Sequence, residues 1–513
     1  MLLRNKILPF LFVFGVLLVL MSLNNTVMAQ ALSDYHLQGI VNEIDLRVGD
    51  LSGKGILQRY ECGSSLGALR QNPCNKRYFT DSSGRAIYLT GSHNWDNLKD
   101  KGKTDPPPAF NFNGYLDFLQ RYNHNFMRLW TWELTKNTAN KEVYFYFVTP
   151  FPWQRSGPGL ALDGKPKFDL SQFDQTYFDR LRSRVIAARD REIYVSIMLF
   201  EGWGMFYMNS SWCWDGHPFN VNNNINGIDG DPNKDGKGLE SHTLQISSIV
   251  ELQEKYLKKV IDTVNDLDNV LYEISNEDHD GSIEWQYHMI NFIHNYEKTK
   301  AKQHPVGMTT HVGLGNNAVF NSAAEWISTA VSTWGDDNDP YKVDPPVADG
   351  NKVIILDTDH LWGVGGDRVW VWKSFIRGYN PIYMDDDLDS TSDAVKEDAR
   401  KAMGHTLAYA SKMNLNDMSP RNDLTSTTYC LANPGFEYLV YKPYKKLKIF
   451  GGSKSNTLFT VNLAKGKYRY EWFNPGVGEI VSTGTFTAKG GNQSFNPPFN
   501  SDAVLYISAD RER

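Results

Sequence analysis

Residues 195–199 read VSIML and residues 353–356 read VIIL, two short runs that are apolar at almost every position. A strand buried on both faces needs such a run, and parallel sheets covered by helices are built from strands of this kind. Similar runs recur along the chain and are separated by segments with helical periodicity. The pattern predicts eight strands, at residues 86–93, 125–132, 193–200, 269–275, 305–310, 326–332, 352–357 and 381–385.

Six helices are predicted between these strands, at residues 112–122, 174–190, 243–267, 282–300, 367–378 and 393–412. In the first of them Phe112, Leu116 and Leu119 recur at the spacing of one helix face. Eight strands with intervening helices predict the α/β class and a (β/α)8 barrel over residues 77–425. The fifth and sixth units are the least regular, and the stretch RYFTDSSGRAIYLTG at residues 77–91 predicts a hairpin at its start.

From about residue 426 the helical periodicity stops and short alternating strands follow one another to the C-terminus. Residues 426–513 are therefore predicted to form a small all-β sandwich domain. Within the barrel, residues 133–172 and 201–242 are long insertions rich in Trp, Tyr, Asn, Gly and Pro. Both follow the carboxyl ends of strands, where barrel enzymes build their sites, although surface decoration is the alternative.

The N-terminus has the features of a secretory signal peptide. Arg4 and Lys6 precede an apolar run at residues 7–23, and small residues around Ala29 offer a cleavage site. The sequence predicts a signal peptide at 1–29, an N-terminal extension at 30–76, a secreted or periplasmic location, and no stable membrane association after cleavage. An uncleaved anchor is the alternative, because the run approaches the length of a membrane span.

Cysteine content and charge narrow the classes of protein further. An oxidising compartment favours a disulfide between Cys62 and Cys74, whereas Cys213 and Cys430 are expected to be unpaired. The net charge of −6 argues against a nucleic-acid partner. Aromatic residues reach 13%, with 14 Trp, and large flat side chains suit sugar rings as well as ordinary cores.

The strongest local motif is VLYEISNE at residues 270–277, a predicted fourth strand that ends in Asn276 and Glu277. Strand alternation predicts that Glu273, Ser275 and Glu277 share a face, with Glu277 at the barrel mouth. Glycoside hydrolysis needs a carboxylic acid beside the leaving oxygen and a second carboxylate opposite it. The alternative for Glu277 is a salt-bridged or helix-capping role.

A second carboxylate is expected from the end of the seventh strand, where residues 352–360 read KVIILDTDH. Asp357 and Asp359 have the same parity, so either can face Glu277, and one of them is expected to be structural. The eighth strand ends in a third acidic cluster at residues 385–387, which includes Asp386. Carboxylates crowded at one rim raise one another's pKa and favour a protonated acid.

Other polar and aromatic residues fall at predicted strand ends and are candidates for substrate binding. These are His93, Trp95, Arg128, Trp130, Glu201, Trp203, Asn276, His311, His360 and Asp386. Arg128 is expected to hold a carboxylate ionised and oriented, and the tryptophans to stack on sugar rings. Each alone is more often a scaffold residue.

No metal or other cofactor is expected, apart from a possible structural Ca²⁺. Residues 229–240 read DGDPNKDGKGLE, in which Asp231, Asn233 and Asp235 match the first half of a calcium loop. The twelfth position is His242 instead of Glu, so an ordinary turn is favoured. No Cys/His spacing typical of zinc is present.

Several motifs together resemble bacterial glycoside hydrolases of the apiosidase-like barrel type. They are YFTDSSGRAIYLTGSHNW (78–95), FMRLWTWE (126–133), YEISNE (272–277), ILDTDHLWGVGGD (355–367) and WKSFIRGYNPIYMDD (372–386). The tail, with FTVNL (459–463), YRYEWFNP (468–475) and FNPPFNSDAVLYI (495–507), resembles a small β domain named after collagen binding in a collagenase. The resemblance covers about residues 77–508.

The resemblance implies roles for some of these residues. In the wider clan of retaining glycosidases the acid/base Glu follows Asn at the end of strand four, which corresponds to Glu277 and Asn276. The nucleophile of that clan lies at the end of strand seven and is usually Glu, whereas this chain has Asp357 and Asp359 there.

The sequence thus predicts an exported glycoside hydrolase acting on an oligo- or polysaccharide. A non-catalytic carbohydrate- or matrix-binding protein with a degenerate barrel is the alternative, because fold does not imply function. A collagenase is disfavoured, since the chain lacks a metalloprotease His-Glu-x-x-His motif.

Overall fold

The computed structural model describes residues 67–137, 146–206, 211–311, 313–388, 392–444 and 458–510. The predicted signal peptide at 1–29, most of the extension at 30–76, and Cys62 of the predicted disulfide lie outside these ranges. Residues 65–513 belong to one compact unit. No helix in the described ranges combines the length and the apolar character needed to cross a membrane.

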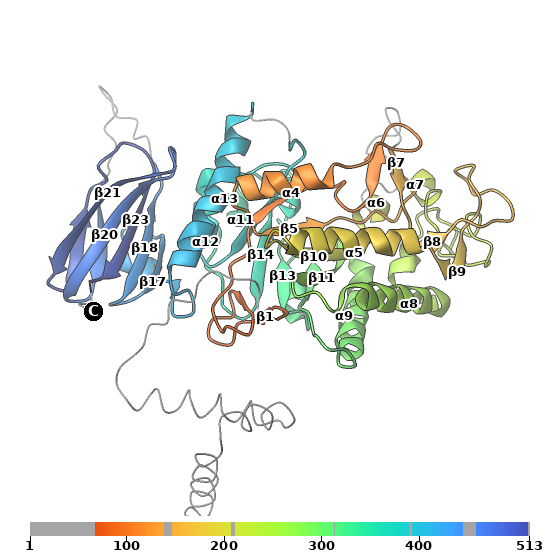
Figure 1. Cartoon of the computed structure of the whole chain (residues 1–513), viewed down its shortest axis with the longest axis horizontal. Coiled ribbons are helices and arrows are strands. Elements are labelled where there is room, and N and C mark those ends of the chain that lie inside the picture. Colours follow the sequence, from red (N-terminus) through yellow and green to blue (C-terminus); the bar gives the residue numbers. More distant parts are fainter. Residues whose placement is uncertain are drawn as a thin grey trace, which may run out of the picture. The chain divides into compact units, whose positions relative to one another are not determined.

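Eight parallel strands form a barrel, and each of the eight predicted strands overlaps one of them (Figure 1). They are β3 (Gly91–His93), β5 (Phe126–Leu129), β10 (Tyr194–Glu201), β11 (Val270–Asn276), β12 (Val306–Thr309), β13 (Trp326–Ser328), β14 (Val353–Asp357) and β15 (Asn380–Met384). Their order in the sheet is β3-β15-β14-β13-β12-β11-β10-β5, and a parallel bridge between Asn94 and Leu129 joins the two ends. The predicted (β/α)8 barrel is confirmed.

The six predicted helices are also present. They are α4 (Phe112–Arg121), α5 (Gln175–Arg189), α8 (Ser247–Val264), α9 (Ile283–Glu297), α12 (Arg368–Ile376) and α13 (Ala394–Lys412). Several begin at an Asp or Asn whose side chain accepts the first free backbone N–H groups, such as Asp174 and Asp393. The irregular fifth and sixth units contain only the short helices α10 (Asn317–Asn321) and α11 (Pro340–Val343).

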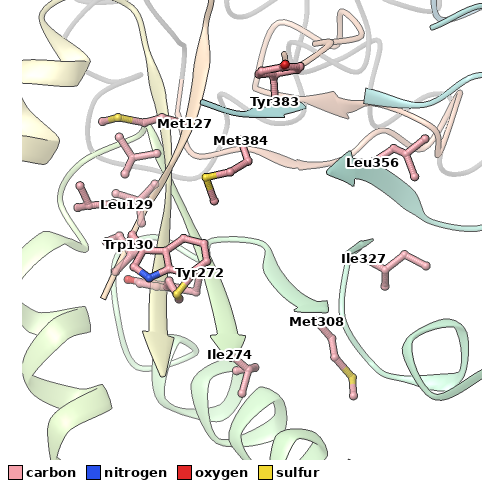
Figure 2. Packing of buried hydrophobic residues seen from close by; sticks show 14 of the residues in the cluster. Met127, Leu129, Trp130, Tyr272, Ile274, Met308, Ile327, Leu356, Tyr383 and Met384 are labelled. Atoms are coloured by element: carbon pink, nitrogen blue, oxygen red, sulfur yellow. The ribbon is translucent and has the colours of Figure 1, made fainter. Parts of the chain in front are cut away.

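The two-residue period of the strands divides their apolar side chains between two cores. Outward-facing side chains belong to the larger core and include Met127, Leu129, Tyr272, Ile274 and Met308 (Figure 2). A smaller cluster lies inside the barrel and includes Leu89, Phe126, Leu271, Val353, Ile355 and Ile382. Trp326 belongs to this inner cluster, and a Cβ at neighbouring Gly307 would lie 1.9 Å from its ring, so glycine is required there.

The two long insertions fold against each other. The first contains β6 (Lys136–Asn137), β7 (Tyr146–Thr149), β8 (Trp153–Gln154) and β9 (Asp169–Phe173), and β7 also pairs with β4 (Asp100–Gly102). The second contains α6 (Trp203–Phe206), α7 (Ser211–Trp214) and the 3-10 helix η1 (Leu239–His242). Phe168 N donates to Asn223 O (2.8 Å) and Ile225 N to Phe168 O (2.9 Å), which ties the insertions together.

The C-terminal region consists of two antiparallel sheets that share one core. The larger has the order β16 (Ser419–Pro420), β17 (Cys430–Asn433), β18 (Glu437–Lys442), β23 (Ala503–Ala509), β20 (Gly466–Asn474) and β21 (Glu479–Ala488). The smaller pairs β19 (Phe459–Leu463) with β22 (Gly491–Phe495). Because β16 already pairs with β17, this sheet begins before the predicted boundary at 426.

The predicted hairpin at residues 77–91 is much shorter than expected. Phe79 and Ile87 form a single antiparallel bridge, and β2 (Phe79–Thr80) pairs mainly with β1 (Arg70–Gln71). The second half of the segment leads to Gly91, where the barrel strand β3 begins, and its residues Tyr88 and Leu89 are buried.

Candidate active site

Arg128 of β5 is the centre of a buried polar network inside the barrel. Its Nε donates to Glu273 Oε2 (2.9 Å), and its Nη2 donates to Glu273 Oε1 and to Asn276 Oδ1. Its Nη1 donates to Asp357 Oδ2 (2.8 Å) and to Asp359 Oδ2 (3.4 Å). All five N–H donors of the guanidinium are therefore used, and they fix side chains from three separate elements.

Asp357 is the carboxylate that this network satisfies most completely. Besides the bond from Arg128, its Oδ1 accepts from His93 Nε2 (2.9 Å) and from the backbone N–H of Asp359 (2.9 Å). Burial alone would raise the pKa of Asp357, but the nearby His93 and Arg128 hold that pKa well below its usual range. Asp357 is thus an ionised, immobilised group.

Glu277 lies immediately after β11 and contrasts with Asp357. Its side chain is buried, and its Oε1 has no hydrogen-bond partner among the described residues. Burial raises the pKa of Glu277 well above its usual range, and the charge of Asp359 raises it further. A carboxyl group in these surroundings holds a proton at neutral pH.

Asp359 is a third buried carboxyl group, in the 3-10 helix η3 (Thr358–His360) that follows β14. Burial raises the pKa of Asp359, and the negative charge of Asp357 acts in the same direction. Arg128 offers it one long hydrogen bond, so Asp359 is held more loosely than Asp357. The charge of Asp359 also acts on Glu277, so these two buried carboxyl groups interact electrostatically.

The predicted alternation along β11 is wrong at its end. Glu273 and Asn276 both bond Arg128, although they are three residues apart, whereas Ser275 Oγ donates to Asp278 (2.7 Å). A regular strand cannot place residues i and i+3 on one face. The backbone leaves the regular conformation here, and Glu277 has a φ of 45°.

His360 adds a second contact to Asn276. Its Nε2 lies 3.0 Å from Asn276 Oδ1 and its Nδ1 lies 2.8 Å from Ser328 Oγ. Burial lowers the pKa of His360 to about 3, and the charge of Arg128 contributes. The neutral ring donates from Nε2 to the amide oxygen, so Ser328 donates to Nδ1.

Glu201, at the end of β10, is a further buried carboxyl group near Glu277. Both of its oxygens accept the N–H of Gly204 (3.1 and 3.2 Å). Burial raises the pKa of Glu201 to about 8 despite these bonds. The group is therefore mostly protonated at neutral pH.

This raised pKa predicts a specific pH dependence of stability. Between pH 4.5 and about 8 the folded protein keeps a proton on Glu201 that the unfolded chain releases, so stability falls as the pH rises through that window. Glu201→Gln should make the fall shallower by up to about 1.4 kcal/mol per pH unit. Urea unfolding midpoints of both proteins at several pH values measure the slopes, and parallel slopes would contradict the assignment.

The three tryptophans that were predicted to stack on sugar rings differ in how much of their surface is exposed. Trp95 and Trp203 are half-buried. Trp130 is buried: its ring lies 5.0 Å from the Arg128 guanidinium and 6.2 Å from the His93 ring. Trp130 therefore packs against the network and presents almost no surface to a ligand, contrary to the prediction of a stacking role.

The acidic cluster after β15 does not join this network. Asp386 is exposed and pairs with Lys396 (2.5 Å), and Asp385 is buried in a two-bond pair with Arg400. These residues anchor α13, so the predicted substrate-binding role of Asp386 is not supported. His311 is buried just after β12, close to the barrel mouth.

Sequence reasoning missed two parts of the site. Glu133 and His242 meet at 3.1 Å beside the end of β10, and His242 also bonds Asp278 (2.7 Å). Glu133 is the last residue of the FMRLWTWE motif and Asp278 follows Glu277, so both lie next to predicted strand ends and could have been chosen as candidates. No predicted strand end lies next to His242.

In the possible calcium loop, side-chain oxygens accept hydrogen bonds from backbone N–H groups of the same loop. Asp231 Oδ2 accepts the N–H of Gly236 (2.9 Å) and Asn233 Oδ1 accepts that of Asp235 (2.8 Å). These are bonds typical of an Asx turn. In the described part of the chain, no group of three or more His, Cys, Asp or Glu is arranged to hold a metal ion.

Comparison with known proteins agrees with the barrel fold. The model of a domain of unknown function, DUF6298, matches residues 136–326. A search of curated proteins finds no match. A solved structure described as a glycoside hydrolase has a TM-score of 0.54 at 12% identity, covering 87% of this chain and 98% of its own. A glycoside hydrolase family 5 protein from Bacteroides vulgatus has a TM-score of 0.55 at 12% identity, covering 87% of this chain and 94% of its own.

These similarities show the fold. The chain shares its barrel fold with these solved structures and also has C-terminal antiparallel sheets.

Proposed function

We propose that this protein is an exported glycoside hydrolase in which Glu277 is the general acid/base and Asp359 the nucleophile. The observation that carries the proposal is the pair of buried, electrostatically interacting carboxyl groups that follow β11 and β14, both with raised pKa. Sites at this end of a barrel are the rule among enzymes of the fold. Export rests on the signal-peptide pattern at residues 1–29.

The chemistry requires one proton donor and one carboxylate. Glu277 protonates the oxygen of the leaving sugar while Asp359 attacks the anomeric carbon, so the glycosidic bond breaks and a glycosyl ester forms. Glu277, now ionised, takes a proton from water, and the resulting hydroxide equivalent displaces Asp359. Of the two carboxyl groups Glu277 has the more strongly raised pKa, which favours it as the group that carries the proton at the start.

Asp357 is proposed as a positioning residue. Both of its oxygens accept strong hydrogen bonds, from Arg128 on one side and from His93 and Asp359 N–H on the other. A carboxylate whose lone pairs are occupied in this way is a poor nucleophile. Its charge helps to orient Arg128, which in turn bonds Asp359.

This division of roles predicts different behaviour for the two aspartates. Asp359→Asn should lower the hydrolytic rate about 10³-fold or more, because the attacking group is lost, with little change in stability. Asp357→Asn should also lower the rate, but with a loss of about 1–3 kcal/mol of stability, because amide N–H groups would face His93 and Arg128 donors. Hydrolysis rates and urea unfolding measure both effects. Full activity of the Asp359→Asn variant would exclude Asp359 as the nucleophile and favour Asp357 instead.

The proposed substrate is an oligo- or polysaccharide. Trp95 follows β3 and Trp203 begins α6 after β10, and both residues are only half-buried, which suits a role in sugar stacking. His93 bonds Asp357, and His360 bonds Asn276. Arg128 donates to both Asp357 and Asn276 and so links the two sides of the site.

The decisive experiment is a hydrolysis screen of the purified protein against plant and bacterial polysaccharides, with the Asp359→Asn variant alongside. Release of reducing sugar by the parent and not by the variant supports the proposal. Binding without cleavage in both would favour a carbohydrate-binding protein with a degenerate barrel.

A further inference from the structure

Glu277 has a backbone conformation that side-chain-bearing residues rarely adopt. Its φ is 45°, in the left-handed region, where the backbone of a non-glycine residue is strained. Such a conformation persists only where the surroundings over-determine it. The structure shows what holds each neighbour of Glu277 in the chain.

On the upstream side, Asn276 is held by the network already described. Arg128 Nη2 and His360 Nε2 both donate to its Oδ1. These bonds fix the residue before Glu277 but leave the residue after it free to turn.

On the downstream side, Asp278 is held by a different set of groups. Its Oδ2 accepts from His242 Nδ1 (2.7 Å) and from Ser275 Oγ (2.7 Å), and its Oδ1 accepts the backbone N–H of His279 (2.9 Å). His242 is the one partner of these three that comes from a distant part of the chain, the insertion that follows β10.

His242 is itself locked in place. Its side chain is fully buried, its ring stacks on Trp285 with centroids 4.5 Å apart and planes within 7°, and its Nε2 lies 3.1 Å from Glu133 Oε2. Glu133 Oε2 also accepts the backbone N–H of Glu201 (2.8 Å). Burial lowers the pKa of His242, but Asp278 and Glu133 together raise it to about 10, so the ring is an imidazolium.

The His242 imidazolium thus links the ends of three neighbouring strands. It contacts Glu133 after β5 and Asp278 after β11, and Glu133 in turn accepts the backbone N–H of Glu201 at the end of β10. We propose that His242 is a positioning residue that, through Asp278, holds Glu277 in its left-handed conformation and so aims its carboxyl group at the scissile bond. The inference rests on the proposed function for its catalytic consequence, whereas the conformational consequence stands by itself.

The chain offers a matched control in His304. This histidine is also fully buried, bonds a buried carboxylate through Nδ1 (Glu297, 2.8 Å) and packs against an aromatic ring, that of Tyr272. It precedes β12 and bonds Leu267 O ahead of β11, at the opposite ends of the strands from the proposed site. Its loss should destabilise the protein without moving Glu277.

The test compares His242→Gln, Asp278→Asn and His304→Gln with the parent, on a substrate found in the hydrolysis screen, below the lowest melting temperature. We expect kcat to fall about 100-fold in His242→Gln and by a similar factor in Asp278→Asn, with KM within threefold, because misplacement of about 1 Å has an effect of that order. His304→Gln should keep both constants within threefold. Equal kcat in the parent and in both site variants would overturn the proposal, and Asp278→Asn alone decides it if His242→Gln does not fold.

Crystal structures of the same variants give a readout that does not depend on activity. Glu277 should leave the positive-φ region in His242→Gln and keep it in His304→Gln. A positive φ retained in both would overturn the positioning role. If the parent cleaves no carbohydrate, the proposed function fails, while this comparison still decides what His242 does to Glu277.

Discussion

Glu277→Gln should lower glycoside hydrolysis about 1000-fold, the scale on which a general acid contributes, while leaving the fold and sugar binding intact. Glu277 is buried and its pKa is raised well above its usual range by burial and by Asp359, so the folded protein contains it as a neutral acid. Glutamine has nearly the same shape and is also neutral, which makes the substitution mild for packing. It cannot, however, give up a proton to the leaving oxygen.

The measurement is the rate of reducing-sugar release by parent and variant, together with thermal melting of both. Glu284→Gln is the control, because Glu284 is exposed on the first turn of α9, and it should have parental activity. Full turnover by Glu277→Gln, on a substrate that the parent cleaves, would exclude Glu277 as the acid.

Arg128→Met should have the largest effect on stability, a loss of about 3–5 kcal/mol, because it removes the cation from a buried ionic network. Arg128 is 1% exposed and bonds Glu273, Asp357, Asp359 and Asn276. Methionine fills similar space but leaves the carboxylates desolvated and repelling one another. Hydrolysis should be lost as well, since the bond that orients Asp359 disappears.

Urea unfolding of Arg128→Met and of the control Arg182→Met measures this effect. Arg182 also makes two bonds to one carboxylate, Asp266 (2.7 and 2.8 Å), but the two side chains are 39% and 62% exposed. A surface pair of this kind contributes at most about 1 kcal/mol. Equal losses in the two variants would show that the barrel interior does not depend on Arg128 as a counter-charge.

The part of the site that follows from strand ends could be predicted from the sequence. The runs at 270–277 and 352–360 end in Asn276, Glu277 and the two aspartates, and in the structure Arg128 bonds Asn276 and both aspartates. The choice between Asp357 and Asp359 could not be made, because residues two apart have the same parity along a strand. The structure separates them through η3, which places Asp359 beyond the end of β14.

His242 and Trp130 show two ways in which position in the sequence misleads: a site residue is missed, or a buried residue is expected to bind substrate. His242 entered the sequence analysis only as the twelfth position of a possible calcium loop, yet it contacts Asp278 and Glu133 through the folding of the insertion. Trp130 lies at a strand end, as a sugar-stacking residue should, yet its ring is covered by Arg128 and His93. The position of a residue in the sequence therefore does not determine how deeply its side chain is buried or which distant residues it contacts.

The sequence by itself determined the barrel, the C-terminal strands and the end of the barrel at which the carboxyl groups gather. These features depend on the local period of apolar residues and on chain order, both of which are written in the sequence. Only the tertiary structure decided which carboxyl group is ionised, which is protonated and which backbone is strained. Those properties depend on burial and on charges brought close from distant parts of the chain, such as Arg128 beside Asp357 and His242 beside Asp278.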